Sequence, residues 1–393
     1  MRVFIIRQQA VVPSDYSEPK EWREVIFFKW AKDYFEKAEL WISDFDHYSL
    51  KKRKKVDFEG SEGVRIFKTP GYKKTVSVWR LFDSWVFGIK IFAAALNKFN
   101  KKDTVIVNLP TPESFFAISI AKFFKGFKLI VDVRDNWPDN FPGGGIIKFF
   151  FSLYVHVLNK ISFSIVDKVI WMSDGLYNNH KNKNLLKKKN LEHKTIPNSF
   201  KKVDITNQSY EINNDIFNKP AISFFGTLNL QFDLKLLKEC LDSDPKSKEF
   251  NYIIAGDGSE LQYLKELFKE YKNVIFLGRI PYDCVQIIAK KSKGLFLLYR
   301  DPENYQNHIT NKVREYAEFR KPIIHNLESN IFTISKNKYQ IGYSLHDGNF
   351  SEAISEIKYN KNPAIYNIES LDNFCRNLSE DVLKKNFLDE IIT

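Results

Sequence analysis

Short hydrophobic runs alternate with amphipathic stretches along the whole chain. Residues 1–6 have the pattern of a buried strand, and after a polar loop hydrophobic residues recur with helical spacing from about 22 to 37, before a second strand begins at 38. This order of strand, loop, helix and strand is typical of a doubly wound parallel sheet. Further strands are predicted at 64–67, 104–108, 128–133 and from 167, with helices at 77–97, 112–124 and 146–163.

The same rhythm restarts after residues 201–219, a polar stretch with little pattern that we interpret as a linker. Predicted strands of this second half run into turns at Gly226, at Gly256 and Gly258, and at Gly278. Glycines let a ligand approach the backbone closely, and ligands of such sheets bind where the strands end. We therefore predict an α/β fold with Rossmann-like domains at 1–200 and 220–370. A C-terminal helix within 371–393 can return to the first domain.

The segment 299–326 contains the strongest candidate ligand site. Thr310 is predicted to cap a helix that starts at Asn311, which leaves backbone N–H groups able to bind phosphate. Glu315 lies one turn into this helix, where its carboxylate can accept hydrogen bonds from a ribose diol. The pattern also fits an ordinary αβ unit in which Glu315 only stabilises its own helix. Three cations accompany the segment: Arg300, Lys312 and Arg314.

Two loops of the first half contain candidate catalytic chemistry. His47 follows the second strand, where it can serve in acid/base chemistry or acceptor binding, or simply be structural. The loop DVRDNWPDNFPGGG follows the strand at 128–133 and contains Arg134, Asp135 and Trp137, residue types that a spacer does not need. Asp135 can orient an acceptor or stabilise positive charge on a sugar ring. Alternatively, Arg134 and Asp135 only pair with each other or cap the next helix.

Composition narrows the classes of partner. The chain has 393 residues, enough for two domains, and its 60 basic and 48 acidic residues give a net charge of +12. A nucleic acid, an anionic membrane or a phosphorylated ligand would suit this charge, but the lysines are dispersed and no nucleic-acid-binding motif is present. Aromatic and basic residues at 79–98 and 146–160 suit either a core or a face on lipid headgroups.

The expected location follows from two absences in the sequence. No signal peptide and no membrane-spanning run is recognised, and three separated cysteines indicate neither disulfides nor a zinc site. We therefore expect a cytoplasmic protein, peripheral at the inner face of the cell membrane.

Several motifs resemble, in order, those of a known enzyme family: SDFDHYSLKKR, VDVRDNWPD, TIPNSF, FFGTLN, IAGDGSELQYL, VIFLGRIPYD and NKVREYAEFRKPII. The chain is similar to GT-B glycosyltransferases, specifically the retaining family 4 enzymes of bacterial surface-polysaccharide assembly. The resemblance implies two Rossmann-like domains facing a central cleft. It also implies transfer of a hexose from a nucleotide-sugar, expected to be a UDP-sugar, to a lipid-linked or saccharide acceptor of capsule or O-antigen synthesis.

The resemblance also implies which residues bind each substrate. The donor's diphosphate would meet Gly226 and Thr227 and the backbone amides of Asn311 and Lys312. Its base would meet Arg279 and Ile280, and its ribose would meet Glu315. The turn at Gly256, Asp257 and Gly258 would shape the pocket. The acceptor would meet the first domain at the loop 8–17 and at His47, Arg80, Arg134, Asp135 and Trp137.

Two positions depart from the family pattern. Asn307 stands where the family has the first of two glutamates, and no cation follows Gly226 before Lys235, so Arg300, Lys312 or Arg134 would have to stabilise the leaving diphosphate. We identify no Asp-X-Asp triplet at a strand end and expect neither a metal nor a cofactor. A nucleotide-sugar 2-epimerase and a catalytically silent partner subunit remain alternatives.

Overall fold

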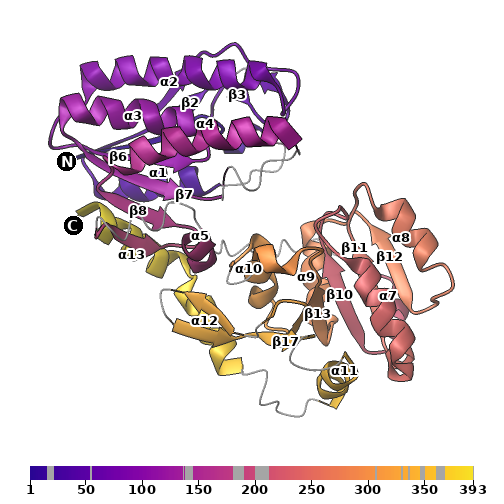
Figure 1. The fold of residues 1–393 in the computed structure, drawn as a ribbon. Helices are drawn as coiled ribbons and strands as arrows, with labels where there is room; N and C mark the ends of the chain where they lie inside the picture. The colour runs from indigo at the N-terminus through magenta and orange to yellow at the C-terminus, as the bar shows by residue number, and fades with distance from the viewer. Residues whose placement is uncertain are drawn as a thin grey trace. The chain divides into compact units, whose positions relative to one another are not determined.

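The computed structural model describes residues 1–15, 22–53, 55–135, 137, 145–179, 190–199, 212–305, 308–328, 331–334, 337–345, 350–359 and 368–392. The chain divides into two compact units, residues 1–198 together with 383–393, and residues 199–382. Each unit is built around a parallel sheet flanked by helices, which confirms the predicted α/β class (Figure 1). The predicted linker lies largely outside the described residues.

The sheet of the first unit has seven parallel strands in the order β5-β2-β1-β6-β7-β8-β9. Their bounds are β1 Arg2–Arg7, β2 Lys37–Ser43, β5 Val64–Phe67, β6 Thr104–Leu109, β7 Lys128–Val133, β8 Lys168–Trp171 and β9 Glu192–Thr195. The strand order reverses between β1 and β6, which lie side by side. In open parallel sheets this switch point is where ligands bind, at the carboxyl ends of the strands.

Alternate residues of β1 face opposite layers, as the two-residue period of a strand requires. Phe4 and Ile6 pack in the core under helices α2 (Val78–Lys98), α3 (Pro112–Lys125) and α4 (Gly145–Phe163). Val3 and Ile5 pack in the opposite core, under α1 (Arg23–Tyr34) and α13 (Glu380–Ile392). The two layers are visible in Figure 1.

The last helix completes the second layer of the first unit. Phe387 of α13 stacks on Phe27 of α1 with ring centroids 4.1 Å apart, and Lys128 of β7 donates to the last carbonyls of α13, at Glu390 and Ile391. Residues 371–382 belong instead to the second unit, where α12 (Ile368–Asn377) packs on α10 (Asn311–Glu318).

The second unit has a six-stranded parallel sheet in the order β12-β11-β10-β13-β14-β17. Its strands are β10 Ala221–Phe225, β11 Asn251–Ala255, β12 Val274–Gly278, β13 Gly294–Leu297, β14 Ile323–His325 and β17 Gly342–Ser344. The remaining helices are α7 Leu234–Ser243, α8 Leu261–Leu267, α9 Tyr282–Lys291 and α11 Phe350–Tyr359, and a single hydrophobic core joins them to the sheet. Here the switch point lies between β10 and β13.

Several short elements were not predicted from the pattern of hydrophobic residues, three strands among them. Strand β9 has the sequence EHKT, and the antiparallel pair β15 (Ile331–Ile334) and β16 (Asn337–Gln340) lies outside the main sheet. β9 is an edge strand with two exposed residues, so it lacks the apolar run that marks a central strand. Among the described residues, no helix has both the length and the apolar character needed to cross a bilayer.

Candidate functional site

Three glycine turns lie side by side at the carboxyl edge of the second sheet. The N–H of Gly226 donates to the carbonyl of Ala255 at 3.0 Å, and the N–H of Gly256 donates to the carbonyl of Gly278 at 2.7 Å. Gly256 has a φ of +155°, and a Cβ there would fall 1.8 Å from the Gly226 carbonyl oxygen. The backbones of these turns are therefore in direct contact, and at Gly256 only glycine fits.

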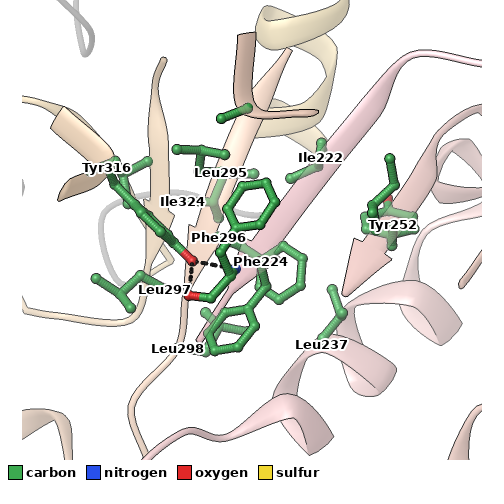
Figure 2. Close-up of a cluster of buried hydrophobic side chains, with 14 of the residues drawn as sticks. Ile222, Phe224, Leu237, Tyr252, Leu295, Phe296, Leu297, Leu298, Tyr316 and Ile324 are labelled. Carbon is green, nitrogen blue, oxygen red and sulfur yellow. Dashed lines mark hydrogen bonds between the residues drawn. The ribbon is translucent and has the colours of Figure 1, made fainter. Parts of the chain in front are cut away.

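Tyr316 anchors helix α10 to this edge. Its side chain is fully buried, and its hydroxyl accepts a hydrogen bond from the Phe225 N–H at 2.7 Å and donates to the Phe225 carbonyl at 3.1 Å (Figure 2). Strand β10 pairs with β13 only at Ile222 and Ser223, so the hydroxyl replaces the missing strand partner at Phe225. The anchor thereby fixes α10 beside the turn that begins at Gly226.

The first turn of α10 brings charged groups to the same turn. Thr310 caps the helix by accepting a hydrogen bond from the Val313 N–H at 3.2 Å, as predicted. The Lys312 ammonium lies 2.7 Å from the Glu315 carboxylate, and a Cβ on Gly226 would lie 3.0 Å from Cε of Lys312. A helix N-terminus and a cation thus lie beside the backbone of Gly226, and a carboxylate pairs with that cation.

Arg300 lies at the other side of the switch point, directly after β13. Its N–H donates to the Gln231 carbonyl at 3.0 Å, and its guanidinium is 3.4 Å from the Glu260 carboxylate. The neighbouring Asp257 carboxylate accepts a hydrogen bond from the Gly258 N–H at 2.7 Å. These contacts tie the loops after β13 and β11 to the glycine turns.

The remaining predicted donor residues follow their strands directly. Arg279 and Ile280 come after β12, and Thr227 is exposed after Gly226. Tyr282, at the start of α9, was not among the residues predicted from the sequence. Burial, and next the charge of Glu315, raise the pKa of Tyr282 to about 12. Tyr282 therefore lies within electrostatic reach of Glu315. Asn307 is outside the described residues.

Three predicted acceptor residues come together in the first unit. The His47 imidazole is hydrogen-bonded to the Tyr72 hydroxyl, and the Arg80 guanidinium lies over the Trp137 ring, 4.8 Å from its centroid. Burial, and next the charge of Arg80, lower the pKa of His47 to about 4. The imidazole is therefore neutral near pH 7, and the pattern gave no signal for Tyr72.

Arg134 and Asp135 follow β7. The Arg134 guanidinium lies 2.7 Å from the buried Glu24 carboxylate, which Arg7 approaches from the other side at 3.2 Å. Asp135 is half-buried and has partners within the chain. Glu24 and Arg7 were not predicted as site residues, because each sits in an element whose pattern is accounted for by the fold.

One Asp-X-Asp triplet does occur at a strand end, contrary to our sequence analysis: Asp44 and Asp46 follow β2. The Asp44 carboxylate pairs with Lys52 at 2.9 Å and accepts from the Thr69 N–H at 2.8 Å, and Asp46 accepts from the N–H groups of Tyr48 and Ser49. Both carboxylates therefore serve the local turn. No group of three potential metal ligands occurs among the described residues.

A surface depression lies at the opposite edge of the second sheet, before the amino-terminal ends of β10, β11 and β12. Lys238, Asp242 and Tyr271 line it and bond to one another, with 2.6 Å between Lys238 and Asp242. Its chemistry is satisfied internally, so we place the site at the carboxyl edge.

No protein-family model and no curated protein matches the chain. Solved structures do match over nearly its whole length. Lipopolysaccharide outer core galactosyltransferase WaaB aligns with a TM-score of 0.62 and 13% identity, covering 100% of this chain and 99% of that one. HepE from Anabaena in complex with UDP-glucose aligns with a TM-score of 0.57 and 14% identity, covering 99% of each.

Sucrose-phosphate synthase from Thermosynechococcus elongatus aligns with a TM-score of 0.62 and 11% identity, covering 99% of this chain and 97% of that one. All three neighbours are glycosyltransferases of the GT-B fold. At such low sequence identity, a match that spans both units shows a shared fold. The chain therefore has the GT-B fold.

Proposed function

We propose that the protein is a glycosyltransferase that moves a sugar from a UDP-sugar to a lipid-linked or saccharide acceptor, with retention of anomeric configuration, in surface-polysaccharide synthesis. The observation that carries this proposal is the group of Gly226, Lys312 and Glu315 at the switch point of the second sheet. A glycine backbone and a helix N-terminus suit a diphosphate, while a carboxylate one turn away suits a ribose. HepE, a structural neighbour, was solved with UDP-glucose.

The roles follow from the positions of these residues. The amides of Asn311 and Lys312 and the Lys312 ammonium would hold the diphosphate beside Gly226, and Glu315 would accept hydrogen bonds from the ribose hydroxyls. Lys312 and Glu315 are paired at 2.7 Å, so binding would exchange this partly exposed pair for phosphate and ribose contacts. No cation follows Gly226 in sequence before Lys235. The negative charge of the leaving diphosphate would therefore be stabilised by Lys312 and the helix dipole.

Turnover assays with a panel of nucleotide-sugars test the proposed transfer reaction, and calorimetry with UDP tests the proposed donor site. Calorimetry with UDP should show binding to the wild type and an affinity at least about tenfold weaker for Glu315→Gln, because a charge-assisted hydrogen bond contributes roughly 1.5–3 kcal/mol. Glu318→Gln removes the same charge one turn later in α10 and is the matched control. Equal affinity of the Glu315 and control variants would misplace the ribose site, and absence of UDP binding would refute the donor class.

The outer face of α4 supports a membrane-bound acceptor. Its apolar residues recur at helical spacing and stay in water, with exposed fractions of 71% for Ile146, 64% for Phe149, 60% for Phe150, 51% for Leu153 and 47% for Val157. Soluble surfaces rarely keep so long an apolar stripe. Because positions three, four, seven and eleven apart share one side of a helix, these residues form a continuous face.

Helix α2 carries further exposed apolar residues on the same side of the sheet (Figure 1). Val78, Trp79, Phe82 and Ile89 are 80%, 67%, 51% and 63% exposed. Exposed Lys90 and Lys160 flank the two helices, and the chain carries a net charge of +12. Aromatic residues beside lysines are the composition of helices that lie in an anionic bilayer surface. We propose peripheral attachment through α2 and α4.

Flotation with anionic vesicles tests this attachment. We expect binding that falls in high salt and is lost when Phe149 and Phe150 are both changed to Ser. Ile368→Ser in α12 is the control, because Ile368 is equally exposed, at 61%, but lies in the second unit. Failure of the wild type to float, or equal flotation of all three proteins, would exclude the proposed face.

A further inference from the structure

Five charged side chains lie buried together at the carboxyl edge of the first sheet. Arg7 ends β1, Asp132 lies in β7 and Arg134 follows it, while Arg23 and Glu24 form the first turn of α1. Their side chains are between 0% and 10% exposed. We call these five residues the charge cluster.

The charge cluster contains one self-sufficient pair. The Arg23 guanidinium binds the Asp132 carboxylate through three contacts of 2.8 to 3.1 Å, and Asn108 donates to the same carboxylate at 2.5 Å. Arg23 also donates to the Pro197 carbonyl at 3.0 Å. This pair is electrically neutral, and both partners are bound on several sides.

The other half of the charge cluster is unbalanced. Of the two carboxylates in the charge cluster, Glu24 pairs with both Arg7, at 3.2 Å, and Arg134, at 2.7 Å. Its oxygens also accept from the Val11 N–H at 3.0 Å. Within these five residues three cations therefore face two anions, which leaves one positive charge in excess among them.

Two further observations mark the excess as uncompensated. Nη1 of Arg7 is buried and has no hydrogen-bond partner within the described part of the chain. Burial, and next the repulsion from Arg134, lower the pKa of the Arg7 guanidinium. The Nε of Arg7 contacts Glu24 and donates to the Gln9 carbonyl at 3.3 Å, so Nη1 is the atom of Arg7 that lacks an acceptor, and desolvation makes such a gap in a buried charge costly.

The position of the charge cluster is that of a ligand site. Arg7 is the last residue of β1 and Arg134 follows β7, and these strands lie on either side of β6, so the charge cluster spans the switch point of the sheet. Helix α1 begins here with its positive dipole end, and Trp22 at its N-cap makes no side-chain cap hydrogen bond. The field of the helix therefore adds to the excess charge.

We propose that Arg7 and Arg134 bind an oxyanion, a phosphate or carboxylate group, that completes the charge cluster. Such a group would accept hydrogen bonds from Nη1 of Arg7 and from Arg134, and it would bring the net charge of the charge cluster to zero or below. Two sources share this chemistry: an anionic group of the acceptor, and the diphosphate of the donor. The inference stands apart from the proposed transfer reaction, because binding an oxyanion requires no turnover.

Calorimetry and thermal unfolding with inorganic phosphate test the inference, against chloride at equal ionic strength. Arg134→Gln leaves a neutral charge cluster, so phosphate affinity should fall at least about tenfold and phosphate should no longer raise the Tm. Lys102→Gln removes an equal charge from an exposed turn before β6, at the opposite edge of the sheet, and should bind phosphate like the wild type.

Glu24→Gln should change phosphate affinity in the opposite direction. It removes the shared carboxylate and increases the excess charge, so the variant should be less stable in chloride and gain more from phosphate, with an affinity at least about tenfold tighter than the wild type. Merely structural arginines would give no such gain. Phosphate responses that are equal in the wild type, Arg134→Gln and Glu24→Gln would overturn the inference. Arg134→Lys keeps the charge and should still bind phosphate, and if Arg134→Gln does not fold, the comparison of Glu24→Gln with the wild type still tests the inference.

Binding of UDP identifies the source. If the donor diphosphate occupies the charge cluster instead of the proposed position beside Gly226, Arg134→Gln weakens UDP and phosphate by similar factors. If the acceptor does, UDP affinity stays at the wild-type value while phosphate affinity falls. Either result supports the oxyanion site. Loss of UDP binding in the wild type would count against the proposed function alone, since the phosphate comparison does not use it.

Discussion

Replacing Tyr316 by Phe should destabilise the second unit and disturb its candidate donor site. The substitution removes one oxygen atom from a fully buried side chain and leaves the ring in place. The lost hydroxyl is the group that accepts from the Phe225 N–H at 2.7 Å and donates to the Phe225 carbonyl at 3.1 Å (Figure 2). Water cannot replace it easily, because Phe225 is itself buried.

The expected cost follows from the two backbone groups left behind. Each buried polar group without a partner costs about 1–3 kcal/mol, so the two together should cost roughly 2–5 kcal/mol of unfolding free energy after some relaxation. Because the hydroxyl also positions α10 beside Gly226, UDP affinity should weaken in the same variant. A loss of packing contributes little, since the ring volume is unchanged.

Tyr252→Phe provides a matched control in the same core (Figure 2). Tyr252 is equally buried, but its hydroxyl has no hydrogen-bond partner among the described residues. Removing that oxygen should leave stability unchanged or raise it by up to about 1 kcal/mol, because a buried, unsatisfied hydroxyl is itself unfavourable.

Urea denaturation of the full chain measures both variants, with hydrogen exchange of β10 peptides to assign the transition to the second unit. Two units need not unfold together, so the comparison uses the exchange free energy of β10 rather than one global midpoint. Unfolding free energies of Tyr316→Phe and Tyr252→Phe that agree within about 0.5 kcal/mol would refute the assigned role of the Tyr316 hydroxyl.

Three further outcomes are expected. Gly256→Ala should lower the free energy of unfolding by at least about 3 kcal/mol, because a Cβ would lie 1.8 Å from the Gly226 carbonyl oxygen. Gly278→Ala should lower it by only about 1–2 kcal/mol, because a Cβ there has nothing within 4 Å. Equal urea midpoints for the two variants would contradict this prediction. Asp135→Asn should lower turnover with UDP affinity intact if Asp135 acts in the transition state, and turnover within a few-fold of wild type would remove it from the site. NMR titration of His47 should give a pKa of about 4, below the ordinary 6.5. Because the unfolded chain then binds this proton at a higher pH than the folded chain, the free energy of unfolding should fall as the pH drops from 6.5 towards 4. A titration midpoint near 6.5 would contradict the burial argument.

The sequence by itself determined the layers and the strand-end turns. Apolar runs and helical spacing report which side of an element is buried, so the order of strands and helices could be predicted without knowing their partners. Gly256 and the Thr310 cap are local features whose residue types follow from backbone geometry. The α/β class was predicted on these grounds, and the GT-B fold from motifs in a fixed order.

Only the tertiary structure decided which polar groups meet. Tyr316 bonds to Phe225, 91 residues away, and Arg134 pairs with Glu24, 110 residues away. Such pairs depend on the order of strands in the sheet, here on β6 lying between β1 and β7, which periodicity does not encode. Arg7 fits an ordinary strand end and Glu24 an ordinary helix start. The excess positive charge of the charge cluster becomes visible only when the carboxyl ends of distant strands are brought to one edge of the sheet.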